Sequence, residues 1–568
     1  MKIAKLGILF DQHEAQSRWS SGQNVFENFL FEVLDHLRIP YEKVDSHEDV
    51  GLFDVLMIAL SGNSSGTSQK LLNYVNSGGT VISYGGLDDL KGVLGVTASP
   101  VLEKGYAFLA SFLHQTTPLR FLHSEYWETQ NEDIRIIHKG YLQPTNRDAE
   151  QTLKPALQQI KCGRGSIERW SVSIPSTIVG LQQGTLPVTE DGIPAPDGTA
   201  NLDEGLLKAD DGFELDWELD RIMTETGMPY FPHPYADLWR EALVEHLLTI
   251  VTEKGMTLPF LDYWPADINH IAMITHDSDL NVEESAELTL STLKKEGVQS
   301  TWCMIAPGYS SSIYEQIKKD GHELALHYNA LEQEQGIWSE EAFLDQLEWL
   351  QKAAATDQIV SNKNHYTRFE GWGELFSWCE KYNIQVDQSR GPSKKGNIGF
   401  LFGTCHPYFP ISWADEQNRF YDVLEVGFLT QDLNHHALAD TSVIQPFLDG
   451  AKRVNGVAHF LFHQFHIYHQ PEVQEAIVQL IRTAKSQGFT FWTSQQINIW
   501  ERERRSINLE WESDEMKAEG SVGREDIAVL IPIGVNEPVE GREGQEIVKR
   551  FGLTCRKIIT KVNRLKNV

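Results

Sequence analysis

The segment IAMITHDSDLN, residues 271–281, joins an apolar run directly to a histidine and two aspartates. Its apolar half predicts a buried strand, and Asp277 and Asp279 follow where that strand should end. An ionised carboxylate at such a place is unfavourable unless a positive charge compensates it. The two aspartates therefore predict a bound cation or, as a structural alternative, the N-terminal cap of the next helix.

Polar side chains also close other apolar segments in the second half of the chain. His327 ends the segment HELALH, His463 ends VAHFLFH, and Asp387 follows a short apolar run. His365 and Arg368 lie together in the polar segment NKNHYTRFEGW. In a (β/α) barrel the carboxyl ends of the strands meet at one mouth, so these residues would gather there.

One aspartate and two histidines form a typical ligand set for a divalent cation that keeps part of its coordination sphere open. Imidazole suits zinc, cobalt, nickel or iron, and zinc is the leading candidate. Such an ion would also supply the positive charge that Asp277 and Asp279 require.

Residues 267–505 carry the alternation of strand and helix that such a barrel needs. Apolar segments such as STWCMIA alternate with amphipathic segments such as VEESAELTLSTLKKEG, and at least six such units follow one another. Ser339 stands where an N-cap is expected for the helix that follows it. The sequence therefore predicts a (β/α) barrel over this range, intact or distorted.

Residues 1–215 show a separate alternation of strands and helices. The apolar runs IAKLGILF, FDVLMIAL and TVISYGG are separated by amphipathic segments, which predicts a doubly wound parallel sheet with helices on both faces. Residues 216–266 are predicted to be a linker and a helix, after a stretch rich in Gly, Pro and Asp. Residues 506–568 contain two apolar runs and are expected to form a small β-rich domain. The predicted fold class is α/β.

The composition limits the classes of partner. The 568 residues carry a formal net charge of -31, and such a surface repels the phosphates of nucleic acids and anionic lipids. No apolar run approaches the roughly 18 residues of a membrane span, and the first residues lack the pattern of a signal peptide. The five scattered cysteines favour free thiols and a reducing compartment. We therefore expect a cytoplasmic protein, with a homo-oligomer among the alternatives for its assembly.

The N-terminal part resembles the class I glutamine amidotransferase-like fold, most clearly in the segment YVNSGGTVISYGG. Catalytic members of that fold carry a nucleophilic cysteine on a turn from strand to helix. Here Tyr84, Gly85 and Gly86 stand after the third strand, and the first cysteine of the chain is Cys162. The resemblance implies a structural or docking domain that lacks the nucleophile.

Residues 267–505 resemble the polysaccharide deacetylase family, the NodB-homology domain. The segment Thr275–His276–Asp277–Ser278–Asp279 corresponds to a family motif of the form T-F-D-D-G. The start Gly321–His322–Glu323, followed by His327, matches a second motif, and Leu461–Phe462–His463 matches a late one. The resemblance covers under half of the chain. It rests on the order of the motifs and on their placement at strand ends.

Two positions depart from the family pattern. Ser278 stands where an aspartate that binds the metal is expected, so Asp279, or else Asp277, must take that place. Leu331 stands where the second histidine is expected, and we infer that His365 replaces it, as in a divergent branch that uses HDxD. The metal ligands that the resemblance implies are Asp279, His327 and His365.

The resemblance implies hydrolysis of an N-acetyl or O-acetyl group on a carbohydrate or a related amide, with water activated by the metal ion. Asp277 would act as the general base, and His463 would protonate the leaving group. Arg368 or Asp387 would keep the base ionised and oriented. The aromatic side chains that could stack on a sugar ring are Tyr366, Trp372, Tyr408 and Trp413.

Two other functions also fit the sequence. A glycosidase on a related barrel would use Asp277 and a second carboxyl group about 5–10 Å away, and it would need no metal. A catalytically inactive carbohydrate-binding protein would account for the irregular ligand set. Metal content separates these two alternatives from the deacetylase.

The remaining histidines have less specific surroundings in the sequence. His322 opens its predicted strand and is therefore expected to be structural. His435, His436 and His469 are expected to lie on the surface or in loops. His459 and His466 compete with His463 for the role of acid because they lie only four residues before it and three after it.

Overall fold

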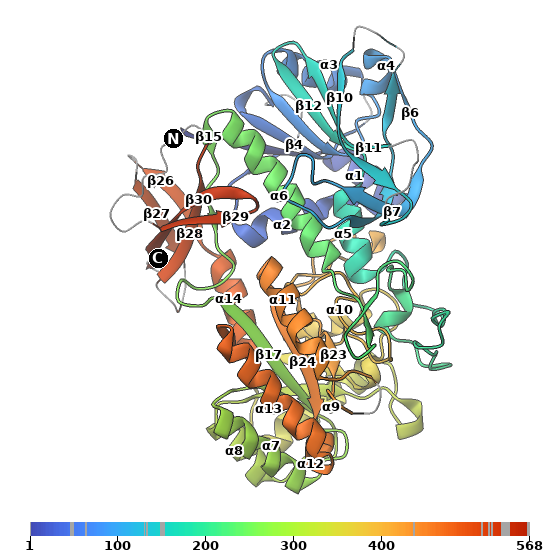
Figure 1. Ribbon diagram of the computed structural model, residues 1–568, viewed down its shortest axis with the longest axis vertical. Helices are drawn as coiled ribbons and strands as arrows, with labels where there is room; N and C mark the ends of the chain where they lie inside the picture. The colour runs from blue at the N-terminus through green and yellow to red at the C-terminus, as the bar shows by residue number, and fades with distance from the viewer. Residues whose placement is uncertain are drawn as a thin grey trace.

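The computed structural model describes residues 2–45, 50–62, 65–129, 131, 134–147, 154–435, 438–512, 515–520, 523, 526–534 and 546–564. Figure 1 shows an N-terminal α/β unit, a barrel-like unit and a C-terminal β unit, with the long helix α6 (Tyr235–Glu253) running between them. Most side chains of α6 are buried, as expected for a helix that is covered on several sides. No helix in the described part of the chain is both long and apolar enough to span a membrane.

The N-terminal unit contains a nine-stranded mixed sheet. Its parallel half follows the order β3 (Glu42–Val44), β2 (Leu6–Phe10), β4 (Val55–Leu60), β5 (Thr80–Tyr84) and β12 (Gly165–Trp170). Its antiparallel half continues through β11 (Lys154–Cys162), β10 (Ile136–Gln143), β7 (Leu102–Phe108) and β8 (Leu119–Ser124). The sequence predicted a wholly parallel sheet, and the structure corrects this to a mixed one. Only Gly163 and Arg164 separate β11 from β12, which leaves no room for a crossover helix.

The second unit is an open, curled parallel sheet. Its strands follow the order β22 (Leu424–Glu425), β21 (Val386–Asp387), β20 (Ser361–Asn364), β19 (Glu323–Tyr328), β18 (Thr301–Met304), β17 (His270–Asp277), β24 (Val457–His463) and β23 (Thr430–Gln431). β25 (Phe489–Phe491) pairs with the start of β17. Within the described residues β22 and β23 do not pair, so the barrel is incomplete. All of these neighbours are parallel, which places the carboxyl ends of the strands at one edge.

Helices cover the outside of this sheet. They are α7 (Glu283–Glu296), α8 (Ser311–Lys319), α9 (Glu340–Ala353), α10 (Glu374–Lys381), α11 (Ile444–Val454), α13 (Pro471–Ser486) and α14 (Ser494–Arg505). Local signals set their ends. Ser339 caps α9 by accepting from the backbone N–H of Ala342, and Thr493 and Gln496 form a capping box at α14. Gly297 ends α7 in the left-handed region, with φ of 63°.

A further sheet forms around the C-terminal strands. It contains β16 (Phe260–Leu261), β28 (Asp526–Pro532), β30 (Leu553–Arg564), β27 (Glu515–Gly520), β26 (Asn508–Glu512) and β29 (Glu546–Arg550). Because β16 precedes the barrel and pairs with β28, the tail is joined to the segment that follows α6. The C-terminal tail and the segment before the barrel thus share one sheet. The predicted domain boundaries at residues 215, 266 and 505 stay predictions.

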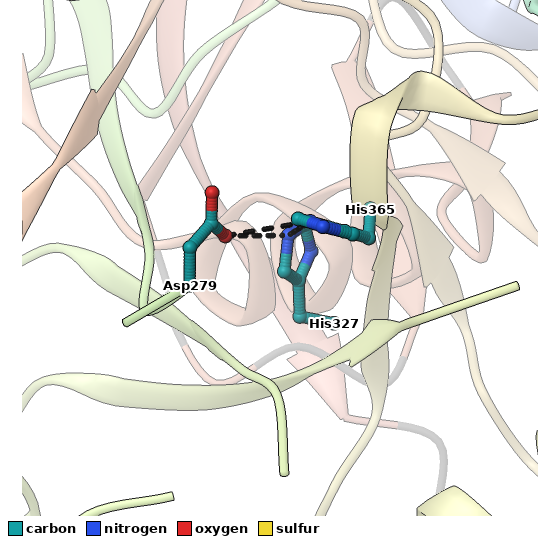
Figure 2. A group of neighbouring side chains, drawn as sticks. All are labelled: Asp279, His327 and His365. Atoms are coloured by element: carbon teal, nitrogen blue, oxygen red, sulfur yellow. Dashed lines mark hydrogen bonds and ion pairs between the residues drawn. The ribbon is translucent and has the colours of Figure 1, made fainter. Parts of the chain in front are cut away.

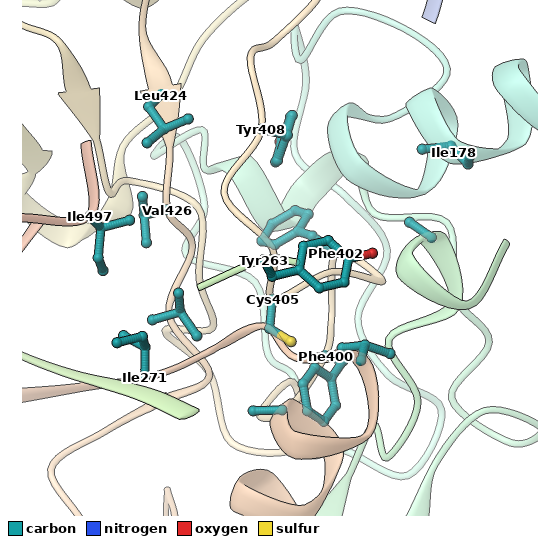
Figure 3. Close-up of a cluster of buried hydrophobic side chains, with 14 of the residues drawn as sticks. Ile178, Tyr263, Ile271, Phe400, Phe402, Cys405, Tyr408, Leu424, Val426 and Ile497 are labelled. Atoms are coloured by element: carbon teal, nitrogen blue, oxygen red, sulfur yellow. The ribbon is translucent and has the colours of Figure 1, made fainter. Parts of the chain in front are cut away.

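A continuous apolar core joins the N-terminal unit to the barrel. Figure 3 shows Ile178, Tyr263, Ile271 and Tyr408 in one buried cluster, although they come from distant parts of the sequence. Polar contacts also cross between the units: the guanidinium of Arg505 donates two hydrogen bonds of 2.7 Å to Glu32. The N-terminal unit is thus packed against the barrel and not held by a loose tether.

The Gly/Pro/Asp-rich stretch before residue 216 lies along the barrel mouth. Val188 forms a backbone bridge with Gly371, and Lys208 forms one with Arg368. The N–H of Phe369 donates to the carbonyl of Leu207 at 3.0 Å. This stretch therefore supports the loop that follows β20 and carries His365. The five cysteines form no disulfide, and all except the half-buried Cys162 are buried.

Candidate metal centre

The carboxyl ends of the barrel strands bring the polar residues together. Asp277 and His463 are the last residues of β17 and β24, and the strand register sets them side by side. His327 lies near the end of β19, and His365 directly follows β20. Asp279 lies two residues beyond β17. Residues up to 186 positions apart thus meet at one edge, as strand-end placement predicts.

Asp279, His327 and His365 form a compact group at this edge (Figure 2). The Oδ1 atom of Asp279 lies 3.3 Å from Nε2 of His327 and 3.4 Å from Nδ1 of His365. The two imidazole nitrogens are 3.1 Å apart. His327 and His365 are buried, and Asp279 is largely enclosed.

The surroundings of these three side chains fit a divalent cation. Nδ1 of His327 lies 2.9 Å from the carbonyl of Lys363, so a neutral ring that donates there presents the lone pair of Nε2 to the centre. Nε2 of His365 faces Glu334 at 3.4 Å, which directs Nδ1 inward. Oδ1 of Asp279 is buried and accepts no well-formed hydrogen bond from the described residues. A divalent cation between the three atoms would offset the repulsion among their lone pairs, in place of a proton on one of the rings.

Asp277 is buried beside this group and pairs with a lysine. Nζ of Lys363 lies 3.4 Å from Oδ1 of Asp277, and Nε2 of His327 lies 3.7 Å from Oδ2. Burial alone would raise the pKa of Asp277, but the charge of Lys363, with further contributions from His327 and His463, brings it below the ordinary value. Asp277 is therefore ionised at neutral pH and able to accept a proton.

His463 is held by a carboxylate on the opposite side of the centre. Its Nδ1 makes a short hydrogen bond to Asp432, which also accepts the backbone N–H of His463 at 2.8 Å. Nε2 of His463 lies 3.4 Å from Oδ2 of Asp279. Burial alone would lower the pKa of His463, but the charges of Asp432 and then Asp279 raise it to about 10. His463 is therefore a cationic proton donor at neutral pH.

Arg368 and Asp387 do not contact Asp277, so their predicted role in orienting the base is corrected. The guanidinium of Arg368 donates to Glu370 at 2.9 Å and to the carbonyl of Ala330. Asp387 accepts from Asn362 at 2.8 Å and from Ser389. Arg368 and Asp387 therefore form hydrogen bonds with other residues and not with Asp277. Lys363 holds the position beside the base.

Two of the four predicted sugar-stacking residues lie within the protein, and Trp413 is partly buried. Trp372 and Tyr408 are only 4% and 1% exposed. Trp413 packs at 4.7 Å against Trp372 and at 6.0 Å against Phe26. The rings of Trp372 and Tyr408 are covered by the N-terminal unit, so the prediction for these two is corrected, and the role of Trp413 stays a prediction. Tyr366 is different: it is 51% exposed and lies edge-on to His365 at 4.6 Å.

Sequence reasoning missed Lys363 and Asp432. Lys363 lies in the strand SNKN, which is polar and carries no apolar run, so it does not look like a strand. Asp432 follows β23, which is only two residues long. A polar residue directly after a short strand was the available signal for Asp432. For Lys363 the only signal was its position two residues before His365.

The remaining histidines also have defined places. His322 accepts the backbone N–H of Ser300 at 3.1 Å, which is a structural contact. His469 is exposed, whereas His435 is buried and stacks on His466 with ring centroids 3.6 Å apart. The expectation of a surface position is therefore corrected for His435. His436 lies outside the described residues.

Comparisons with known proteins find similar solved structures at low identity. No protein-family model and no curated protein matches the sequence. A protein assigned as a polysaccharide deacetylase from Mycobacterium smegmatis is 15% identical with a TM-score of 0.32, over 43% of this chain and 93% of that one. The Xyl-CE4 domain of a multidomain xylanase from the hindgut metagenome of Trinervitermes trinervoides is 16% identical with a TM-score of 0.26, over 40% and 89%. The beta-galactosidase of Bacillus circulans sp. alkalophilus is 14% identical with a TM-score of 0.24, over 30% and 28%. At these scores the geometry of the site itself must carry any functional argument.

Proposed function

We propose that this chain is a metal-dependent hydrolase that removes N- or O-acetyl groups from a carbohydrate or a related amide. One observation carries the proposal: three buried ligand atoms converge between an ionised carboxylate and a cationic histidine. Asp279, His327 and His365 would hold the ion, with zinc as the first candidate from the donor types. A divalent cation held there supplies the positive charge that polarises an acyl oxygen and acidifies water.

The residues on either side of the ligands supply proton transfer. Asp277 would take a proton from the attacking water, since Lys363 keeps its carboxylate charged at neutral pH. Nε2 of His463 would give a proton to the leaving amine or alkoxide, and Asp432 would keep the ring charged and fixed. General acid and base groups each contribute about 10²–10⁴-fold to such reactions.

The glycosidase alternative has weaker support from the site. Acid–base hydrolysis of a glycosidic bond needs one carboxyl group that keeps its proton. The carboxyl groups at the centre, Asp277 and Asp279, both have pKa values below the ordinary value, because nearby cationic groups outweigh the effect of burial. Neither is suited to be the acid, and His463 takes that place. An inactive sugar-binding protein would keep the same geometry without turnover.

The N-terminal unit is proposed to be a non-catalytic, amidotransferase-like domain. Gly85 and Gly86, which follow β5, have φ of 79° and 62° in the left-handed region. Cys162 ends β11, in the antiparallel half of the sheet. The turn where the fold's nucleophile is expected thus carries no thiol. A cytoplasmic location and a place in the HDxD branch of the deacetylases remain parts of this proposal.

Acetate release from acetylated chito-oligosaccharides tests the proposed function. The full chain loaded with Zn²⁺ is expected to release acetate, to lose this activity with a chelator, and to regain it when Zn²⁺ is restored. The Asp279→Asn variant should stay inactive at any Zn²⁺ concentration that activates the natural chain. Undiminished release after complete metal removal would contradict the proposal and favour metal-free chemistry.

Asp432→Asn is expected to shift the alkaline limb of the pH profile downward. The acid works only while His463 is protonated, and the pKa of His463 is raised to about 10 in the presence of Asp432. Removal of that negative charge takes away the largest contribution that raises the pKa, so the pKa of His463 should fall. The measurement is kcat/KM against pH for both proteins loaded with the same ion. An unchanged alkaline limb would show that Asp432 does not control the acid.

Tyr366→Asn is expected to raise KM with little change in kcat. Its exposed ring beside His365 offers a stacking face worth about 0.5–1.5 kcal/mol, or roughly 2–10-fold in affinity. Asparagine is chosen because Tyr366 has φ of 55°, a conformation that asparagine tolerates. The matched Tyr366→Phe variant keeps the ring and should keep the natural KM. Equal KM values in Tyr366→Asn and Tyr366→Phe would argue against stacking.

A further inference from the structure

We propose that Asp432, His463 and His466 form a second, inhibitory binding site for a divalent transition-metal ion such as Zn²⁺. One potential ligand atom from each of these residues lies within 4.8 Å of the others. Binding at this site is independent of the proposed function. Only its inhibitory effect rests on the proposed role of His463.

The three side chains are positioned by separate elements. His463 occupies the N-cap position of α12 (Gln464–His469), and His466 lies three residues further, so the two rings meet on one face of the first turn. Their centroids are 5.4 Å apart. Asp432 follows β23, and its backbone N–H donates to the carbonyl of Leu461 at 2.9 Å, which fixes it beside β24.

Neighbouring side chains hold the ring of His466 without using both of its nitrogens. The ring stacks on His435 at a centroid distance of 3.6 Å. The amide nitrogen of Gln470 lies 2.8 Å from Nδ1 of His435 and 3.5 Å from Nδ1 of His466. In the described part of the chain no hydrogen bond involves Nε2 of His466, so that atom is available to a ligand.

The second site is distinct from the proposed metal centre because the imidazole of His463 lies between them. Its Nε2 faces Asp279 of the first group, and its Nδ1 faces Asp432 of the second. One carboxylate and two imidazoles suit zinc, nickel or copper. His463 and His466 are only partly buried, whereas the histidines of the first group are buried. We therefore expect the second site to bind more weakly than the first.

An ion in the second site takes the place of the hydrogen bond between Nδ1 of His463 and Asp432. An ion bound at Nδ1 takes the lone pair that otherwise holds a proton, and that proton leaves to solvent. The carboxylate of Asp432 then contacts the ion in place of the proton. The ring of His463 is then held by the ion and no longer by Asp432, so its Nε2 leaves the position in which it faces Asp279 and the leaving group. Excess zinc should therefore inhibit the enzyme reversibly.

Equilibrium dialysis of the full metal-free chain against graded Zn²⁺ measures the sites directly. The natural chain is expected to bind a tight ion and a weaker one. His466→Gln should lose the weaker ion only, and His365→Gln should lose the tight ion only. His469→Gln is the matched control because His469 is exposed on the same helix, and it should bind as the natural chain does.

The outcomes separate this proposal from the proposed function. Unchanged weak binding in His466→Gln, or a natural chain that saturates with one ion, would overturn the second site. Retention of the tight ion in His365→Gln would instead count against the first centre. In activity assays, His466→Gln should raise the inhibitory Zn²⁺ concentration by at least about 10–100-fold, the loss typical of a supporting residue alone. Inhibition at an unchanged concentration would also overturn the proposal.

Discussion

Replacing Asp277 with asparagine is expected to lower kcat by about 10²–10⁴-fold while the protein still binds zinc. Asp277 lies beside the ligands and is held ionised by Lys363 at 3.4 Å. Asparagine has nearly the same shape but accepts no proton from water. Steady-state kinetics on acetylated oligosaccharides, with metal content measured on the same samples, give the result.

The control for this prediction is Asp415→Asn, a change at an exposed carboxylate in the loop before β22. It should leave both kcat and zinc content unchanged. If Asp277→Asn loses its zinc, Asp277 is a ligand, as the sequence left open, and the role of base must pass to another group. If it keeps both zinc and full activity, the proposed acid–base chemistry is wrong.

Replacing Lys363 with methionine is expected to have the largest effect on stability, about 3–5 kcal/mol, because it removes the main compensating charge from the buried carboxylate of Asp277. The side chain of Lys363 is fully buried, donates to Thr275, and lies 5.0 Å from the ring centroid of Phe428. Chemical denaturation followed by tryptophan fluorescence measures the change. The double variant Lys363→Met/Asp277→Asn should recover much of the lost stability.

The pH dependence of this effect has a defined sign. The pKa of Asp277 is below its ordinary value in the folded protein, so its ion pair stabilises the fold above the ordinary carboxyl pKa. That contribution is lost as the pH falls through the lowered pKa. The difference in stability between the natural chain and Lys363→Met should therefore shrink toward low pH. A difference that is constant with pH, or no recovery in the double variant, would contradict the Lys363–Asp277 pairing.

The residues at the strand ends could be predicted from the sequence because long apolar runs mark strands. Asp277, His327 and His463 each close such a run, and parallel pairing then places them at one edge. The residues that tune them could not be found in this way. Asp432 follows a strand of two residues, and Lys363 lies in a strand of four; their partners are 31 and 86 positions away. Such pairings depend on tertiary packing, which no local pattern encodes.

The predictions for Trp372 and Tyr408 failed for a related reason. Trp372, Tyr408 and Trp413 lie in loops after barrel strands, where a sugar-binding role is reasonable. In this chain the N-terminal unit packs onto those loops: Phe26 stacks on Trp372 at 5.7 Å, and the hydroxyl of Tyr408 donates to the carbonyl of Gln182. The sequence of the barrel alone does not tell which loops another unit covers. Tyr366 escapes this cover and stays exposed.

The half-antiparallel N-terminal sheet shows the limits of the strand–helix pattern. Strands β2, β4 and β5 follow the alternation with helices, and they pair in parallel as predicted. Strands β7 to β12 follow one another with no long helix among the described residues between them. Their short connections favour antiparallel neighbours. The loss of the strand–helix alternation after β5 would have predicted the antiparallel half of the sheet.

Anomalous scattering from crystals of the full chain grown with Zn²⁺, measured above and below the zinc absorption edge, tests the central claim most directly. We expect a strong peak about 2.0–2.2 Å from Oδ1 of Asp279, Nε2 of His327 and Nδ1 of His365. Well-ordered side chains with no peak between them, or a peak only beside Asp432 and His466, would contradict a metal centre at this edge of the barrel.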